Sequence, residues 1–268
     1  MPRALLLVLL LLTSIYPNLF GQKAGQKVEA KVEKRLMNAQ RVETAPKIDG
    51  DLSDPVWIGA EVATDFVQNR PNPGRMASQK TEVKILYDDE AIYMGAMMYD
   101  TAPDSILHQL SDRDQLGNTD YFGVWISCFQ DGINAFEFIV SPDGVQFDAQ
   151  VSTFGEDQNW NAVWQCNTSI TEEGWVAEFK IPYSAIRFAE KEEQVWDINF
   201  NRVIRRHREQ SFWQHVDPEV AGFVNQSGVI KGIKDIKPPL RLFFYPYASA
   251  YVQVDSDGNI MMPYVGSV

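Results

Sequence analysis

The chain has 268 residues, of which 36 are acidic and 24 are Lys or Arg, giving a net charge of −12. A chain this acidic is unsuited to binding nucleic acid through a general positive field. Its seven Trp, ten Tyr and fifteen Phe offer far more surface for burial than an intrinsically disordered chain carries. The length suffices for one large or two small globular domains.

Residues 1–21 have the pattern of a secretory signal peptide. Arg3 gives a basic start, residues 4–12 form an apolar run, and Gly21 provides the small residue needed at the cleavage site. The apolar run is shorter than the roughly 20 residues that span a bilayer. We therefore expect the mature protein to be exported. In an oxidising compartment Cys128 and Cys166 could pair, but their apolar neighbours favour two buried free thiols.

Residues 22–40 are rich in Lys, Glu, Ala and Gln and have few large apolar side chains, which is typical of a tether. From Arg41 onward, short runs of β-branched and aromatic residues alternate with turn residues, as in an all-β domain. Gly132 and Gly144 each follow an aspartate in a tight turn, so residues 121–151 should form three consecutive antiparallel strands. Further strands are expected at residues 79–87, 91–99, 162–170, 175–181, 195–204, 211–216 and 228–236.

Little helix is expected. Asp54 is a suitable N-cap and Pro55 a suitable first residue for one short helix through Ala60. The fold class predicted for residues 41–236 is therefore all-β, as a single antiparallel β-sandwich. Two prolines that follow Lys237 end this domain, because proline withdraws a backbone donor from a sheet.

Residues 237–268 begin with this proline linker and continue with an aromatic-rich, loosely alternating segment over residues 240–254. Two interpretations remain open. The segment is either a last strand of the sandwich or the first strand of an outer-membrane β-barrel, whose strands have such aromatic residues and alternation. On the second interpretation we expect the gene to continue past Val268 with more alternating strands.

The search for catalytic motifs finds no nucleophile elbow, no H-E-x-x-H, no C-x-x-C and no P-loop. Glu137 and Glu178 each lie mid-strand among apolar neighbours. A glycosidase needs two carboxyl groups roughly 5 to 10 Å apart, so these two are the candidate pair for hydrolysis. The alternative is that each is a buried glutamate held by an arginine such as Arg187 or Arg202.

Four aspartates suggest a calcium site. Asp100, Asp112, Asp114 and Asp120 provide hard oxygen ligands around a turn at Gly117, and calcium collects six to eight such ligands. The spacing differs from that of an EF-hand, and flanking helices are not expected. A solvated acidic loop without metal is the alternative.

Residues 154–164 combine aromatic side chains with amides and carboxylates in a loop. Flat rings stack on the C–H face of a sugar while amides bind its hydroxyls, so Asn159 and Trp160 are candidate carbohydrate-binding residues. Trp164 begins a strand and is assigned to the core.

The chain has one concentration of basic residues, close to Trp213 in the sequence. It consists of Arg202, Arg205, Arg206 and Arg208. Strand alternation divides these arginines between the two faces of a sheet, which favours ion pairs with acidic residues over the binding of an anion.

Four separated motifs, in the right order, resemble the family 9 carbohydrate-binding modules. They are residues 46–57, residues 86–100, Asp120 and residues 174–182. The match extends over about residues 41–236. The resemblance implies a β-sandwich that binds sugars, is commonly accessory to polysaccharide-degrading enzymes and is stabilised by calcium.

Other segments resemble a bacterial subgroup of exported proteins of unknown function more closely. They are residues 134–150, 160–164, 181–188, 196–206 and 238–247. In that subgroup the module precedes a long outer-membrane-type β-barrel. This resemblance implies a location in the periplasm or outer membrane of a Gram-negative bacterium, with a C-terminal barrel in the full-length gene product.

Sugar-binding members of the family hold a sugar end between two Trp rings. One ring lies in the loop before the strand that starts at Asp120, and the other lies in the loop before the last strand. Here these loops contain residues 116–118 and 220–223, and neither supplies a Trp. Substitute rings are Phe223, Trp160 and Trp213, which with Arg113 and Asn159 make up the candidate sugar-binding residues.

The resulting prediction is a non-catalytic carbohydrate-binding module of an exported protein. It would be accessory to the breakdown or uptake of a xylan-like or cellulose-like polysaccharide. The alternatives are a periplasmic interaction domain of an outer-membrane barrel protein that binds no sugar, and a glycoside hydrolase. An oligosaccharide or polysaccharide is the expected partner, Ca²⁺ the expected ion, and nucleic acid is excluded.

Overall fold

The computed structural model describes residues 33–152, 154–240, 249–254, 256–258 and 260–266. The predicted signal peptide and most of the predicted tether lie outside these residues. Among the residues described, no helix has the length and apolar character needed to cross a membrane.

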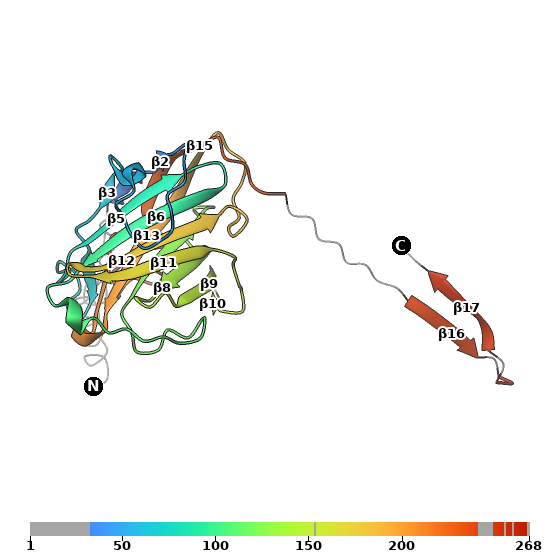
Figure 1. The fold of residues 1–268 in the computed structure, drawn as a ribbon. Helices are drawn as coiled ribbons and strands as arrows, with labels where there is room; N and C mark the ends of the chain where they lie inside the picture. The colour runs from blue at the N-terminus through green and yellow to red at the C-terminus, as the bar shows by residue number, and fades with distance from the viewer. Residues whose placement is uncertain (1–32, 153, 241–248, 255, 259, 267–268) are drawn as a thin grey trace, which may run out of the picture. The chain divides into compact units, whose positions relative to one another are not determined.

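Two β-sheets pack face to face, as Figure 1 shows. The larger, nine-stranded sheet has the order β1 (Leu36–Asn38), β15 (Gly228–Lys234), β13 (Glu193–Ile204), β7 (Tyr121–Ser127), β8 (Ala135–Val140), β9 (Gln146–Ser152) and β10 (Gly155–Asp157). Two further strands extend from β13 in this sheet, β14 (Glu209–Phe212) and then β4 (Val67–Arg70).

The second sheet has six strands. Its order is β11 (Gln165–Thr171), β12 (Gly174–Pro182), β6 (Ala91–Tyr99), β5 (Thr81–Tyr87) and β2 (Gln40–Arg41), with β3 (Val62–Ala63) also paired to β5. Short 3₁₀ turns connect the strands at η1 (Pro55–Trp57), η2 (Pro103–Ser105), η3 (Arg205–His207) and η4 (Val224–Gln226). The all-β sandwich is confirmed.

Three details differ from the sequence-based expectation. The short helix is a 3₁₀ turn over Pro55–Trp57 rather than a helix through Ala60, and no side chain caps it. Strand β1 forms within the predicted tether and β2 at its boundary with the predicted sandwich. They pair in parallel with β15 and β5, so both sheets are mixed rather than purely antiparallel. Met37 explains why β1 was missed, because it is the one fully buried side chain in a strand of three residues.

The core lies between the two sheets. In β7 and β8 the inward side chains include Phe122 and Phe138, and β12 contributes Phe179 from the opposite sheet. The rings of Phe122 and Phe179 meet edge to face, with centroids 5.9 Å apart. Because side chains alternate along a strand, Trp125 of β7 and Glu137 of β8 face away from this core.

A buried carboxylate holds the motif of residues 46–57 against the six-stranded sheet. Glu178 accepts hydrogen bonds from the backbone N–H of Gly50 at 2.8 Å and of Asp49 at 3.0 Å, and from Trp57 Nε1 at 3.2 Å. Gly95 provides the space for this segment, since a Cβ there would lie 3.1 Å from the Trp57 ring. The motif of residues 46–57 therefore stabilises the fold through these contacts with the sheet.

The C-terminal segment forms a separate hairpin. Strand β16 (Ser249–Val254) pairs in antiparallel fashion with β17 (Ile260–Gly266), and among the described residues β16 joins neither sheet of the sandwich. Of residues 240–254, those that the structure describes in β16 are therefore paired within this hairpin.

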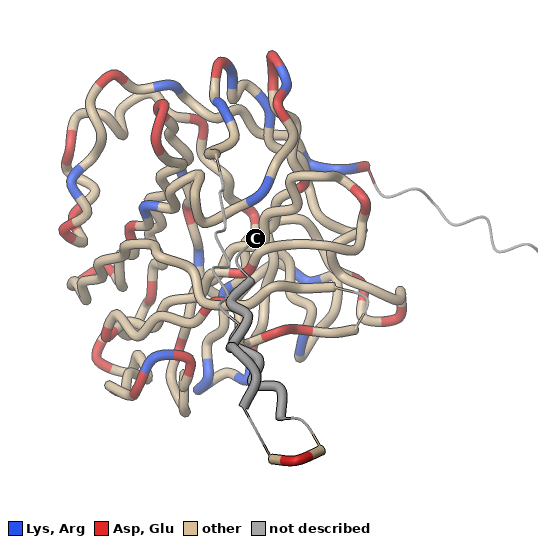
Figure 2. Tube along the Cα trace, turned by 90° about the vertical axis from the view of Figure 1, so that its right-hand side faces the viewer, with Lys and Arg blue, Asp and Glu red and all other residues tan. Residues whose placement is uncertain are grey.

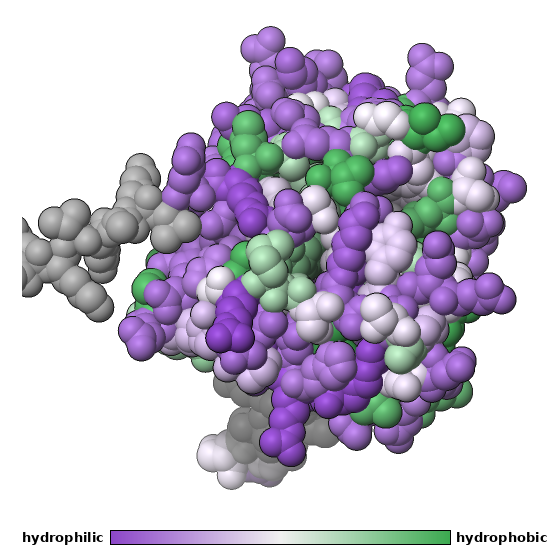
Figure 3. Space-filling view, turned by 90° about the vertical axis from the view of Figure 1, so that its left-hand side faces the viewer, coloured by the Kyte–Doolittle hydropathy of each residue, from purple (hydrophilic) through white to green (hydrophobic). Residues whose placement is uncertain are grey.

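The surface of the sandwich is polar and mixed in charge. Figure 2 shows acidic residues spread over many loops with Lys and Arg between them. The side of the molecule drawn in Figure 3 is mainly hydrophilic, and its hydrophobic residues form small separate patches. Scattered patches of this size are normal on a soluble surface and do not indicate a large docking interface there.

Candidate functional site

The outward side of the nine-stranded sheet is called the outer face below. In β7 and β8 its residues include Trp125 and Glu137, which lie directly opposite each other in the strand register. Strand β13 contributes Asn201, which lies opposite Gly123 of β7, and Tyr121 lies at the start of β7. Aromatic and polar groups thus share one surface of regular strands, which holds them in fixed positions.

Two loops border the outer face. From one side, Leu116 packs against the cluster of Ile139, Phe147 and Ala149. From the other side, Phe223 packs on Trp125, with ring centroids 4.9 Å apart. These are the two loops to which the resemblance assigns the sugar clamp, and the structure brings both onto the same sheet face.

The aromatic cluster at this border has three rings. Trp125 stacks on Phe212 with centroids 5.4 Å apart and planes 20° from parallel, while Phe223 is tilted by 47°. Trp125 is only 7% exposed, whereas Phe223 is half-buried and presents part of its ring to solvent. Phe223 is therefore the ring in this cluster that a ligand can reach.

Glu137 is the most unusual polar group on the outer face. Its side chain is almost completely buried, and one of its oxygens, Oε2, has no hydrogen-bond partner among the described residues. Burial raises the pKa of Glu137 to about 8; the nearby Glu156 carboxylate adds to this rise, and the Trp125 side chain opposes it. The Trp125 indole N–H faces this carboxyl closely enough to lower its pKa, although Nε1 makes no hydrogen bond of regular geometry with any described residue.

Further polar groups surround this pair. Gln210 of β14 donates a hydrogen bond to the side-chain oxygen of Asn201 at 3.2 Å. The guanidinium of Arg205 lies 5.5 Å from the centre of the Tyr121 ring, and burial raises the pKa of the Tyr121 hydroxyl. Arg70 of β4 lies opposite Gln210 and is exposed. The outer face thus offers donors and acceptors suited to hydroxyl groups beside a partly exposed ring.

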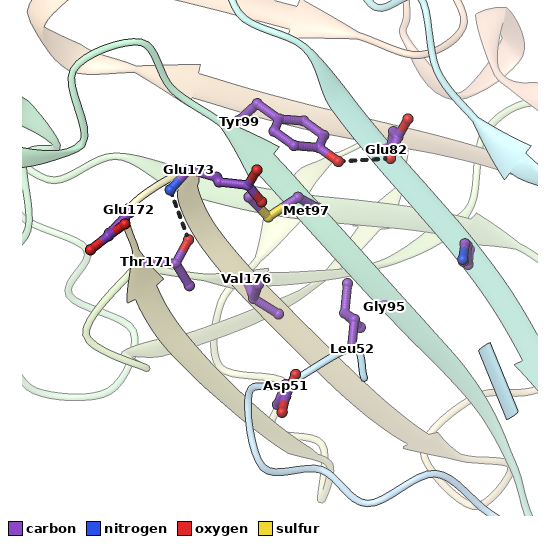
Figure 4. Close-up of a pocket in the computed structure, with 11 residues that line it drawn as sticks. Asp51, Leu52, Glu82, Gly95, Met97, Tyr99, Thr171, Glu172, Glu173 and Val176 are labelled. Atoms are coloured by element: carbon purple, nitrogen blue, oxygen red, sulfur yellow. Dashed lines mark hydrogen bonds between the residues drawn. The ribbon is translucent and has the colours of Figure 1, made fainter. Parts of the chain in front are cut away.

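A groove of about 470 Å³ lies on the opposite side of the molecule, on the outward surface of the six-stranded sheet. Figure 4 shows its residues, which converge from β5, β6 and β12 and from the turn between β11 and β12. Its apolar lining is Leu52, Met97 and Val176.

The chemistry of this groove is less suited to a neutral sugar. Its carboxylates are Asp51, Glu82, Glu172 and Glu173. Its one aromatic ring is already engaged, because the Tyr99 hydroxyl donates to Glu82 at 3.2 Å and the Lys80 ammonium lies 5.0 Å from the ring centre. One face of this ring is therefore already covered by an ammonium group.

The predicted sugar-binding residues occupy different places. Phe223 borders the outer face, whereas Trp213 is 4% exposed and packs on Phe200 in the core, so its ring is not available to a ligand. Arg113 bonds to Asp148 and Gln146 of β9 and so fastens the acidic loop to the sheet.

The remaining two candidates lie together at the far end of β8 and β9. Trp160 is half-buried and packs on Phe136 with ring centroids 5.3 Å apart. Asn159 is exposed and donates from its backbone and side chain to Asp157. The structure therefore divides the predicted set between two surfaces and the core.

The predicted calcium ligands do not converge. Among the residues that the structure describes, no group of three or more His, Cys, Asp or Glu side chains could hold a metal ion. Asp112 is exposed, and Asp114 accepts a hydrogen bond from the backbone of Asp148. Asp100 and Asp120 are instead buried beside arginines.

Two guanidinium groups lie beside the Asp100 carboxylate, which was predicted from the sequence to bind calcium. Arg206 donates to Asp100 Oδ1 at 2.6 Å, and the buried Arg202 lies 3.8 Å from Asp100 Oδ2. Burial alone would raise the pKa of Asp100, but the hydrogen bonds from Arg206 and Ala102 and the two positive charges bring it below its ordinary value. These residues therefore do not fit a calcium ion, and Arg202 and Arg206 form the ion pairs expected of the basic cluster.

The carboxylate pair considered for hydrolysis is separated. Glu137 points outward from the nine-stranded sheet and Glu178 outward from the six-stranded sheet, so the thickness of both sheets lies between them. Packed sheets are about 10 Å apart, and a glycosidase pair must lie within about that distance across a single cleft. Glu137 and Glu178 therefore cannot act together on one bond.

Some relevant residues were missed from the sequence. Tyr121, Trp125 and Asn201 were not selected, although the alternation of their strands places them opposite the core side. Strand alternation shows that β7 and β8 have two apolar faces. It does not show which face packs on the second sheet and which one is covered only by loops. Cys128 and Cys166 are both free, as predicted, but only Cys128 is buried, whereas Cys166 is half-buried.

Comparisons with known proteins agree with this architecture. The family model described as "Carbohydrate family 9 binding domain-like" matches residues 48–227. A family 9 carbohydrate-binding module from Caldicellulosiruptor kristjanssonii, solved in complex with glucose, has 14% identity and a TM-score of 0.54, covering 78% of this chain and 99% of its own. The complex of such a module with cellotriose gives 15% identity, a TM-score of 0.54 and coverage of 80% and 99%.

A third solved structure is a putative carbohydrate-binding protein from Bacteroides uniformis. It has 12% identity and a TM-score of 0.58, and the match covers 76% of this chain and all of the other. No curated protein matches the chain. The structural likenesses establish the fold, and the family model spans more than half of the sequence. The chain therefore belongs to the carbohydrate family 9 binding domain-like family.

Proposed function

We propose that this protein is a non-catalytic carbohydrate-binding domain that holds a sugar on the outer face of the nine-stranded sheet. The observation that carries the proposal is the position of Glu137 and Trp125. Both have an unpartnered hydrogen-bonding atom, and both lie between the two loops that border the face. Buried polar atoms without a partner are rare in folded proteins and point to a partner that the isolated chain lacks.

The physical basis of binding follows from the groups present. The exposed part of the Phe223 ring would stack on the C–H face of a sugar, and this contact removes apolar surface from water. Glu137, with a pKa near 8, carries its proton at neutral pH, so the sheet beneath the sugar holds an uncharged carboxyl there. Gln210 and Asn201 add amide groups at the edge of the same surface.

A neutral saccharide suits these groups. A protonated Glu137 does not repel a neutral sugar, and binding requires no charge to be buried. Support for this ligand class also comes from the family 9 modules that were solved with glucose and with cellotriose. We propose a xylan-like or cellulose-like polysaccharide as the natural ligand.

The proposed setting is that of an exported accessory domain. The signal-peptide pattern of residues 1–21 supports export, and the resemblance to the barrel-containing subgroup supports a place in the periplasm or outer membrane of a Gram-negative bacterium. In this setting the domain would present polysaccharide to the machinery for its breakdown or uptake, with a C-terminal barrel as its covalent partner.

Titration calorimetry with glucose, cellotriose and xylotriose tests the proposal. We expect measurable binding of at least one of these sugars, and about a tenfold loss of affinity in Phe223→Ala because a stacking ring is removed. Glu172→Gln, in the groove of the other sheet, is the matched control and should bind as the wild type does. The absence of heat with all three sugars, or equal loss in the control, would contradict the proposal.

A further inference from the structure

A small pocket of about 230 Å³ lies where β7 ends, β8 begins and β9 ends. Its lining includes Cys128 and Phe136, whose side chains belong to the core between the sheets, and Phe129, which is 53% exposed at the rim. The half-buried ring of Trp160 supports Phe136 from behind, with centroids 5.3 Å apart. The pocket thus has an aromatic floor and one exposed aromatic wall.

The size of the pocket limits its ligand. Pockets for drug-sized ligands have volumes of roughly 300–1,000 Å³, and this pocket is smaller. A single sugar unit is therefore a better match than a long oligosaccharide segment. Burial raises the pKa of the Cys128 thiol, so the floor is neutral and does not repel an anion.

Two polar residues of the pocket have side chains without a partner. Arg187 and Gln150 both line the pocket, and neither side chain has a hydrogen bond or ion pair among the described residues. Asn134, also in the lining, is held by Asp131, which accepts from its side-chain nitrogen at 2.6 Å. Donors are therefore available on a pocket whose walls are apolar.

Arg187 is not alone among the described arginines in lacking a side-chain partner, since Arg75 lacks one too, but Arg187 is the arginine that lines this pocket. An exposed arginine on a protein with net charge −12 has many carboxylates to pair with, yet Arg187 pairs with none in the part of the chain that the structure describes. Two carboxylates of neighbouring loops are hydrogen-bonded within those loops: Asp131, beside the lining residue Asn134, accepts from Ile133 and Asn134, and Asp157 accepts from Asn159. The guanidinium remains available for an external carboxylate.

We propose that this pocket is a second saccharide subsite and that it selects a sugar unit bearing a carboxylate, such as a hexuronate. The sugar's C–H face lies on Phe129, its carboxylate pairs with Arg187, and Gln150 binds a hydroxyl. Arginine binds carboxylate with two parallel hydrogen bonds, which gives both strength and orientation. The inference takes its ligand class from the proposed carbohydrate binding, and its position and charge preference from the pocket.

The test compares glucuronate, glucose and acetate as ligands in titration calorimetry with the purified protein. We expect glucuronate to bind about tenfold or more tightly than acetate, because acetate has the charge without the ring that stacks on Phe129. In Arg187→Met glucuronate affinity should fall by about tenfold or more, since a charge-assisted pair is removed. Phe129→Ala should reduce it as well.

Arg75→Met is the matched control, because Arg75 is another exposed arginine without a described side-chain partner, and its loss changes the net charge equally. The melting temperature of each variant verifies that it folds. The inference is overturned if Arg187→Met binds glucuronate as the wild type does, if Arg75→Met loses as much affinity, or if acetate binds equally well.

The two proposals fail separately. If Phe223→Ala removes glucose binding and Arg187→Met leaves glucuronate binding intact, acidic sugars bind on the outer face, and only the second subsite is disproved. If glucuronate binding depends on Arg187 while no neutral sugar binds, the pocket stands and the outer-face site is disproved. If no saccharide binds at all, both proposals are wrong.

Discussion

The Glu137 carboxyl lies directly across the strand pair from Trp125 on the outward side of the nine-stranded sheet. Neither Glu137 Oε2 nor Trp125 Nε1 has a hydrogen-bond partner in the described part of the chain, although both are buried. Water-filled or ligand-filled sites commonly explain such groups, since an unsatisfied buried polar atom costs about 1 to 3 kcal/mol. The pair is therefore the centre of the proposed sugar site.

The raised pKa of Glu137 predicts a dependence of stability on pH. The folded protein holds the proton up to about pH 8, whereas a glutamate in the unfolded chain loses it near pH 4.3. Between these values the folded state binds more protons, so the free energy of unfolding should fall as the pH rises, by at most about 1.4 kcal/mol per pH unit. Glu137→Gln should remove the contribution of Glu137 and so reduce the slope, while the raised pKa values of Asp120 and Glu178 keep part of it.

Urea unfolding of the wild type, Glu137→Gln and Glu172→Gln at pH 5 to 9 measures this effect. Glu172 is exposed, so its variant should keep the slope of the wild type. The prediction is wrong if Glu137→Gln and the wild type lose stability in parallel as the pH rises.

The contacts of Glu178 predict a large loss of stability on truncation. Glu178→Ala leaves the N–H groups of Gly50, Asp49 and Trp57 without their acceptor. We expect the free energy of unfolding to fall by about 2 to 4 kcal/mol. Glu173→Ala on the neighbouring exposed turn should change it by less than about 0.5 kcal/mol. Equal unfolding midpoints in urea for the two variants would disagree with this role.

The packing around Gly95 predicts that alanine is not tolerated there. A Cβ on Gly95 would lie 2.5 Å from Leu52 Cδ2 and 3.1 Å from the Trp57 ring. Gly95→Ala should therefore displace the motif segment and cost about 1 to 3 kcal/mol, as overpacking typically does. Gly74→Ser separates steric overlap from backbone strain. No atom lies within 4 Å of a Cβ at Gly74, so this variant adds only the strain of its φ of +82°. If Gly95→Ala has the same melting temperature as the wild type, the predicted steric overlap at this position is contradicted.

The arginines beside Asp100 predict a fold that does not depend on calcium. Arg206 and Arg202 already supply the positive charge at this carboxylate. Addition of either calcium or EDTA should leave the melting temperature unchanged within about 1 °C. Arg206→Met should lower it, because a hydrogen-bonded charge pair is lost from a buried carboxylate, at a cost of about 1 to 3 kcal/mol. A rise of several degrees in the melting temperature on adding calcium would contradict this prediction. It would show that calcium binds to the folded protein.

The sequence predicted the strands well where alternation is long and turns are marked. Gly132 and Gly144 both have positive φ, and the three strands that they separate form the expected meander. Strand β1 escaped prediction because its three residues pair in parallel with a strand that begins 192 positions later, at Gly228. Long-range parallel pairing leaves no periodic signal in so short a segment.

The candidate site was harder to predict than the fold. Composition identifies Trp213 and Trp160 as rings but does not say that Trp213 faces the core while Trp160 lies at the surface. Likewise, Asp100 and Asp120 look like metal ligands until the fold places Arg202 and Arg206 beside Asp100. Which charges meet depends on loops and strand ends that are far apart in the chain, and the sequence alone does not contain that distance information.

The most direct test of the central claim is a titration of the ¹⁵N-labelled protein with cellotriose, followed by the NMR signals of the Trp indole N–H groups. The account predicts that the Trp125 Nε1 signal shifts most, together with backbone signals of the loop around Phe223, while the signals of Met97 and Val176 in the opposite groove stay in place. Shifts confined to that groove, or none at saturating sugar, would contradict sugar binding on the outer face.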